Sequence, residues 1–169
     1  MPEYWLDANV LIDAKNGHFS FEVAPGFWDC LVELAVSGCL RSPLLVLAEL
    51  TDGNDELAKW AKNNAGVLFC DPSEEVQHKY NEIADYVRGY YDEAFAKTFL
   101  EKADAWHIAH AACEGGRVVT SETPSRTQPP PRNSKAKIPD VAKAFDVECM
   151  SMNGMLIAAD VQITFSIGR

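Results

Sequence analysis

The sequence predicts an α/β protein in which a central parallel β-sheet is covered by helices on both faces. Short apolar runs, typical of buried strands, alternate along the chain with longer segments in which apolar residues recur every three or four positions. Strands separated by helices pair in parallel, and the helices then cover both faces of the sheet. The chain has 169 residues and no internal repeat, so we expect one domain spanning residues 1–169.

The first third of the chain is predicted to contain two short strands and four helices. An apolar run that begins at Tyr4 leads to Asp7, and a helix follows it. Ser42 and Pro43 are typical of a helix start, because serine caps a helix and proline fits its first turn. The predicted elements are strand 3–7, helix 9–14, a helix from residue 27 that Gly38 ends, strand 40–41, helix 44–50 and helix 54–64.

The middle third is predicted to be mostly helical. A strand over 67–70 ends at Asp71 and Pro72. Two helices are then expected, a long one from Pro72 to about Tyr91 and a short one over 95–100. The segment 103–114 is apolar on most sides, which predicts a central buried helix that Asp104 begins and two glycines end.

The last third is predicted to contain two strands, two helices and one long loop. Strand 117–120 ends in the polar pair Ser121 and Glu122. Residues 123–137 contain four prolines and many polar side chains, so we expect them to be too polar to pack and to form a loop that is either disordered or functional. The remaining predicted elements are helix 138–145, strand 147–150 and helix 154–161.

Four carboxylates are predicted to share one edge of the sheet. In parallel sheets, the carboxyl ends of strands and the starts of the following helices converge. Like charges about 4 Å apart repel by about 4 kcal/mol at an effective dielectric near 20, so clustered acids need cations or protons. Carboxylate oxygens suit Mg²⁺ or Mn²⁺, which predicts metal-dependent phosphate chemistry. The four acids are Asp7, Glu49, Asp104 and Glu122.

Each acid other than Asp7 also has a simpler interpretation. Asp104 could only cap its helix, Glu49 could be a solvated surface residue, and Glu122 could be an ordinary loop acid. A phosphohydrolase with a nucleophilic aspartate at the first strand end is an alternative function. In the haloacid-dehalogenase-like family, that chemistry needs a second acid two residues later, and Asn9 stands at that position here, which counts against this alternative. A further alternative is a catalytically inactive RNA-binding or assembly module.

Four segments taken together resemble the ordered motifs of PIN-domain nucleases. The segment Lys137-Ile138-Pro139-Asp140, which follows the long loop, is similar to the DUF4411 PIN-like subgroup of bacterial proteins. The four segments are Leu6-Asp7-Ala8-Asn9-Val10-Leu11-Ile12, Ala48-Glu49-Leu50, Ala103-Asp104-Ala105-Trp106-His107-Ile108-Ala109 and Val118-Val119-Thr120-Ser121-Glu122.

The resemblance implies a three-layer sandwich with a parallel sheet of about five strands. It also implies a Mg²⁺- or Mn²⁺-dependent endoribonuclease, the toxin of a toxin-antitoxin pair, with a protein antitoxin as partner and a homodimer as the assembly. By position, Asp7, Glu49 and Asp104 match the three core acids of the family, while Glu122 stands where most members have aspartate. The resemblance implies auxiliary polar roles for Asn9, Thr120, Ser121 and Asp140.

Charge and composition indicate which kinds of molecule the protein could bind. The net charge of −10 argues against a surface that is basic overall and binds nucleic acid non-specifically. Residues 117–143 nevertheless carry a local charge of +4, and we expect this segment to contact RNA backbone, with a solvated loop or a protein-docking segment as alternatives. No membrane-spanning segment is expected, and we predict a cytoplasmic location. The predicted RNA-binding residues are Arg126, Arg132, Lys135 and Lys137.

His107 and His110 lie three residues apart in the predicted central helix. No metal-ligand spacing accompanies them, so we expect packing rather than catalysis. Tyr90 and Tyr91, at the end of the long helix, are expected to be exposed.

Overall fold

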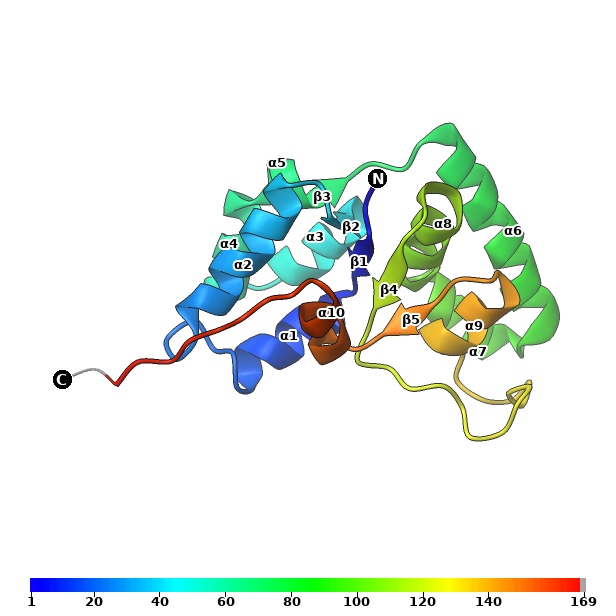
Figure 1. The fold of residues 1–169 in the computed structure, drawn as a ribbon. Helices are drawn as coiled ribbons and strands as arrows, with labels where there is room; N and C mark the ends of the chain where they lie inside the picture. Colours follow the sequence, from blue (N-terminus) through cyan, green and yellow to red (C-terminus); the bar gives the residue numbers. More distant parts are fainter. Residues whose placement is uncertain (168–169) are drawn as a thin grey trace.

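The structure is a computed structural model that describes residues 1–167. Its centre is a five-stranded sheet in which every pair of neighbouring strands is parallel, in the order β3-β2-β1-β4-β5 (Figure 1). The predicted α/β class and the parallel five-stranded sheet are therefore confirmed. The strands are β1 (Tyr4–Leu6), β2 (Leu40–Pro43), β3 (Phe69–Cys70), β4 (Arg117–Val119) and β5 (Cys149–Met150).

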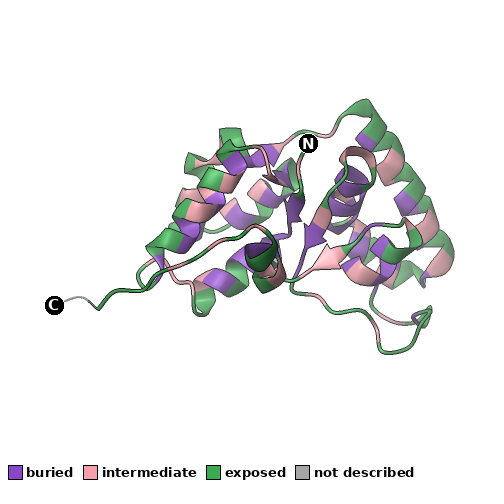
Figure 2. Cartoon of the chain, in the orientation of Figure 1, coloured by how far each residue is buried: buried purple, intermediate pink, exposed green. Residues whose placement is uncertain are grey.

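Apolar side chains alternate between the two faces of the sheet along a strand, so a hydrophobic core forms on each face. In β1, Tyr4 and Leu6 contribute to one core and Trp5 to the other, because successive side chains of a strand point to opposite faces. Figure 2 shows the buried strands between two layers of helices. None of the helices within residues 1–167 is long and apolar enough to cross a membrane. The first layer holds α1 (Ala8–Asn16), α2 (Pro25–Val36), α3 (Leu44–Thr51), α4 (Glu56–Asn63), α5 (Ala65–Leu68) and α10 (Met152–Ala158), and the second holds α6 (Glu74–Tyr90), α7 (Glu93–Leu100), α8 (Asp104–Glu114) and α9 (Ile138–Ala144).

The segment that precedes β3 differs from the prediction of a strand over 67–70. Residues 65–68 form the one-turn helix α5, because the carbonyl of Asn64 accepts the backbone N–H groups of both Val67 and Leu68, at 3.2 and 3.0 Å. Only Phe69 and Cys70 remain for the strand. A short apolar run fits a buried helical turn as well as a strand, and here the local hydrogen bonds favour the turn.

The predicted helix start at Ser42 is also wrong. Ser42 and Pro43 belong to β2, and Pro43 is the residue that precedes the first turn of α3. The hydroxyl of Ser42 is completely buried and donates to the carbonyl of Leu6 at 2.7 Å, so it joins two strands instead of capping a helix. Near the C-terminus, α10 begins at Met152 rather than at residue 154, because Ser151 caps it.

The loop over 123–137 packs against the protein, contrary to the expectation that it is too polar to do so. It leaves the end of β4 and returns to α9 (Figure 1). The Tyr90 hydroxyl donates to the carbonyl of Pro130 at 2.6 Å, and the guanidinium of Arg132 lies 5.4 Å from the centre of the Tyr90 ring. Tyr91 is 4% exposed, so the expected exposure of this residue is wrong. The loop therefore packs against Tyr90 at the end of α6.

Candidate active site

Asp7 lies where β1 ends beside β4. Its side chain is buried, and its backbone N–H donates to the carbonyl of Val119 at 3.0 Å. The hydroxyl of Thr120 donates to the Asp7 carboxylate at 3.0 Å and accepts the backbone N–H of Glu122 at 3.1 Å. Thr120 therefore orients the carboxylate of Asp7 and the start of the segment that follows β4.

Thr120→Val is expected to lower the free energy of unfolding by about 1 to 3 kcal/mol, because it leaves a buried carboxylate oxygen without its hydrogen-bond donor. Thr120→Ser retains the hydroxyl and serves as the matched control. Urea unfolding at pH 7 measures both variants. Equal stability of the valine and serine variants would show that this hydrogen bond does not stabilise the site.

Asp104 lies in the first turn of α8 and is 7% exposed. Burial, followed by the charges of the other three acids, raises the pKa of its carboxyl to about 7, although the charge of Lys102 opposes this shift. The interpretation of Asp104 as the helix cap is wrong, because Ala103 occupies the capping position. The structure thus brings Asp104 close enough to Asp7 for the two charges to interact in a poorly solvated place.

His107 ties the start of α8 to the end of β1. Its two ring nitrogens lie 2.8 Å from the carbonyl oxygen of Ala103 and 2.9 Å from that of Leu6. The carbonyl of Leu6 also accepts the hydroxyl of Ser42. His107 and His110 are both fully buried, which confirms that they pack in the core. The side chain of His107 therefore fixes Asp104 on α8 relative to Asp7.

Glu49 approaches the site from α3. Glu49 is exposed, yet its carboxylate accepts the backbone N–H of Ala103 at 2.8 Å. It is therefore not the purely solvated residue of the simpler interpretation. A cavity of about 460 Å³ opens here, lined by Asn9, Ala48, Glu49, Asp52, Glu101, Lys102 and Asp104.

Three charged residues of this cavity, Asp52, Glu101 and Lys102, were not among the sequence-predicted site residues. Lys102 lies two residues before Asp104 and Asp52 three residues after Glu49, so proximity to the predicted acids was the available signal. Such spacing alone does not distinguish a residue of the cavity from an ordinary charged surface residue.

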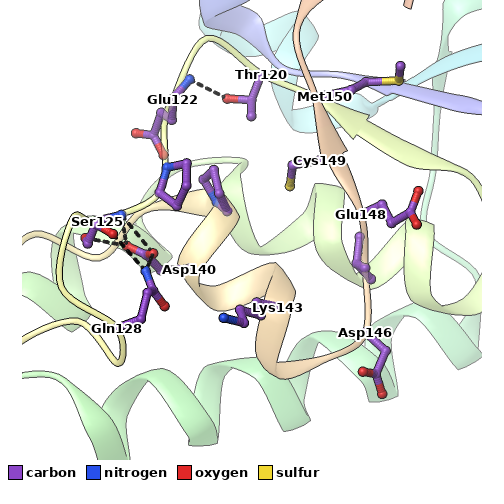
Figure 3. Close-up of a pocket in the computed structure, with 13 residues that line it drawn as sticks. Thr120, Glu122, Ser125, Gln128, Asp140, Lys143, Asp146, Glu148, Cys149 and Met150 are labelled. Carbon is purple, nitrogen blue, oxygen red and sulfur yellow. Dashed lines mark hydrogen bonds between the residues drawn. The ribbon is translucent and has the colours of Figure 1, made fainter. Parts of the chain in front are cut away.

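Glu122 lies on the other side of Thr120 and faces the loop. One carboxylate oxygen accepts the backbone N–H of Ile138 at 2.7 Å, and the other accepts Lys135 at 3.2 Å. Ser121 is exposed and is bonded to none of the four acids. A second cavity, of about 640 Å³, lies between this segment, α9 and β5 (Figure 3).

Asp140 is buried beside the second cavity and holds the loop. Its carboxylate accepts the backbone N–H of Ser125 at 3.0 Å and the side-chain amide of Gln128 at 2.8 Å, as Figure 3 shows. These groups occupy both of its oxygens, since the Ser125 hydroxyl also donates to it. Asp140 therefore holds the loop against α9, whereas Lys137 occupies the capping position of that helix.

The four predicted RNA-binding residues differ in their surroundings. Lys135 contacts Glu122, Lys137 donates to the carbonyl of Thr123 at 3.2 Å, and Arg132 stacks on Tyr90. Arg126 is exposed and makes no hydrogen bond or ion pair with another residue of the described chain. Three of the four cations thus already have partners inside the protein.

The acids fit a hard cation held by a small number of protein ligands. Within residues 1–167, no group of three or more His, Cys, Asp or Glu side chains is arranged so that it could hold a metal ion. Mg²⁺ commonly takes only one or two carboxylates and completes its coordination with water and substrate phosphates. Asp7 and Asp104 are buried, interacting carboxylates of this kind, whereas Glu49 and Glu122 already accept backbone N–H groups.

Comparison with known proteins agrees with this architecture. Residues 4–163 match the family model described as Domain of unknown function (DUF4411). A chain of the crystal structure of VapBC2 from Rickettsia felis, bound to a DNA fragment from their promoter, has a similar fold with a TM-score of 0.50. The two share 18% sequence identity over 88% of this chain and 97% of that chain. No curated protein matches the sequence.

Proposed function

The chain belongs to the DUF4411 family, and we propose that this member, with its PIN-like fold, is a Mg²⁺- or Mn²⁺-dependent endoribonuclease that cleaves phosphodiester bonds of RNA. The observation that carries the proposal is the pair of buried carboxylates, Asp7 and Asp104, at the edge of a parallel sheet. Two interacting buried acids are unfavourable in their ionised forms unless a cation compensates their charge. A divalent cation supplies the positive charge that such a site needs and leaves coordination positions open for a phosphate oxygen of the substrate.

In this proposal, Asp7 and Asp104 hold the ion and the surrounding residues position them. Thr120 orients Asp7, and the contact of Glu49 with the backbone of Ala103 fixes the start of α8. A bound Mg²⁺ or Mn²⁺ activates water and stabilises negative charge on a phosphodiester. Lys102 lines the same cavity and offers a positive charge to a phosphate that enters it.

The RNA is proposed to approach along the basic loop. Arg126 is available to contact RNA backbone as the protein stands, whereas Arg132, Lys135 and Lys137 would exchange contacts within the protein for contacts with phosphate. Contacts of this kind make affinity fall as salt is added. The acidic remainder of the chain would confine RNA to this side of the molecule.

The test is incubation of the purified protein with a panel of RNAs that includes tRNA, in Mg²⁺ or Mn²⁺, with a chelator control. We expect fragments of RNA that require the metal and disappear with the chelator. RNA binding without cleavage would favour the inactive binding module. The carboxylate of Glu122 supports that alternative, because it accepts the backbone N–H of Ile138. Release of phosphate from a monoester without RNA cleavage would favour the phosphohydrolase.

A protein antitoxin is proposed as the partner of this chain. The support is the similar chain solved in the VapBC2 complex. Co-expression with the protein encoded next to it, followed by the same cleavage assay, tests the proposal. We expect the co-purified complex to cleave RNA more slowly than the free chain. The homodimer stays a prediction, which the molar mass of the purified chain in solution tests.

A further inference from the structure

We propose that Glu122 is a positioning residue that locks the 123–137 loop beside the site, and that it is not a direct metal ligand. The part of the proposal that concerns the metal rests on the proposed function. The part that concerns the loop rests only on contacts within the protein. It assigns to Glu122 a role different from that of the aspartate that most PIN-domain nucleases carry at this position.

Both oxygens of Glu122 are used within the protein. One accepts the backbone N–H of Ile138 at 2.7 Å, and Ile138 is fully buried at the first position of α9. The other accepts the ammonium of Lys135 at 3.2 Å. If the carboxylate moved to share an ion with Asp7 and Asp104, the buried N–H of Ile138 would lose its acceptor, and the charge of Glu122 would come closer still to that of Asp104.

The contact closes a long segment of chain. Glu122 and Ile138 are 16 residues apart, and their hydrogen bond joins the two ends of the loop. A second contact, from Asp140 to Ser125 and Gln128, holds the early part of the loop against α9. The backbone N–H of Asp92 donates to the carbonyl of Arg132 at 3.0 Å and holds the centre.

The length of the side chain decides between the two roles. Glutamate extends one carbon–carbon bond further than aspartate, and in the structure this length reaches the N–H of Ile138. Glu122→Asp should therefore open the loop, as Glu122→Ala should. Glu122→Gln keeps an oxygen that can accept the N–H of Ile138, so it should keep the loop closed while removing the charge.

Limited trypsin digestion measures the state of the loop at Arg126 and Arg132. Cleavage of a native protein at such sites reports how often the segment opens. We expect on the order of 10-fold faster cleavage in Glu122→Ala and Glu122→Asp, and a rate near wild type in Glu122→Gln. Glu148→Gln is the matched control, because Glu148 lines the same cavity and its side chain makes no hydrogen bond or ion pair within residues 1–167.

Binding of Mn²⁺ to the RNA-free protein, measured by calorimetry, gives the second result. We expect Glu122→Gln to bind Mn²⁺ within about 3-fold of wild type, and Asp7→Asn to bind on the order of 100-fold more weakly. With RNA, Glu122→Ala should raise KM more than it lowers kcat, because a displaced loop affects substrate binding first.

Two results would overturn the proposal. One is a loss of Mn²⁺ affinity in Glu122→Gln as large as that in Asp7→Asn, which would make Glu122 a ligand. The other is tryptic cleavage of Glu122→Ala at the wild-type rate, which would show that Glu122 does not lock the loop. If wild type binds no Mn²⁺, the metal-dependent function fails, and the digestion alone then decides whether Glu122 locks the loop.

Discussion

Asp7→Asn is expected to lower metal-dependent RNA cleavage by on the order of 10³-fold or more. Asparagine has nearly the shape of aspartate, and its side-chain oxygen can still accept the Thr120 hydroxyl that lies 3.0 Å from the Asp7 carboxylate. The substitution therefore removes the negative charge and leaves the local packing in place. Single-turnover cleavage of the best RNA of the panel, at saturating Mn²⁺, measures the effect.

The matched control for this variant is Asp13→Asn. Asp13 is an exposed acid in α1, the helix that follows Asp7, and its side chain makes no ion pair within residues 1–167. We expect it to cleave at the wild-type rate. Cleavage by Asp7→Asn within 10-fold of wild type would show that the carboxylate of Asp7 is not part of the catalytic site.

Asp104→Asn is expected to stabilise the metal-free protein at pH 8 while it abolishes metal-dependent cleavage. Burial and neighbouring acids raise the pKa of Asp104 from 3.8 to about 7 in the folded protein. The stability contributed by the protonated carboxyl is complete below pH 4 and is lost as the pH rises through 7. At pH 8 the ionised group therefore destabilises the protein, by up to about 4 kcal/mol, and asparagine removes that effect.

Urea unfolding at pH 5 and pH 8 measures this difference between variant and wild type. The advantage of Asp104→Asn should be larger at pH 8, because wild type has by then lost the contribution of the protonated carboxyl. Added Mn²⁺ should stabilise wild type at pH 8, by about 2.7 kcal/mol at 100 times its Kd, and should have little effect on the variant. A variant less stable than wild type at pH 8 would show that Asp104 contributes to folding in its ionised form.

The fold could be predicted where one signal was sufficient. The alternation of apolar strands and amphipathic helices led to a parallel sheet with both faces covered, and strand 117–120 matches β4 to within one residue. The prediction failed where a short segment fits two local structures. Residues 67–68 and Ser42 each had a plausible local role, and their actual roles depend on Asn64 and Leu6.

The candidate site, like the fold, could be predicted from the sequence only in part. The sequence predicts that Asp7 and Asp104 approach each other, because strand ends and helix starts meet at one edge of a parallel sheet. It does not predict that Glu49 binds the backbone of Ala103 or that Glu122 binds that of Ile138, since the partners lie 54 and 16 residues away. The two glutamates therefore match the family pattern by position, while in this structure each accepts a backbone N–H group.

The sequence by itself determined the fold class, the place of the acids at the edge of the sheet and the basic character of the 123–137 loop. These features follow from periodicity and composition, which act locally along the chain. The tertiary structure alone decided that the loop packs on Tyr90, that Asp104 is buried enough to raise its pKa, and that Glu122 binds the backbone of Ile138. Burial and hydrogen-bond choice depend on groups that are distant in sequence, because a side chain takes the partners that the folded chain places around it.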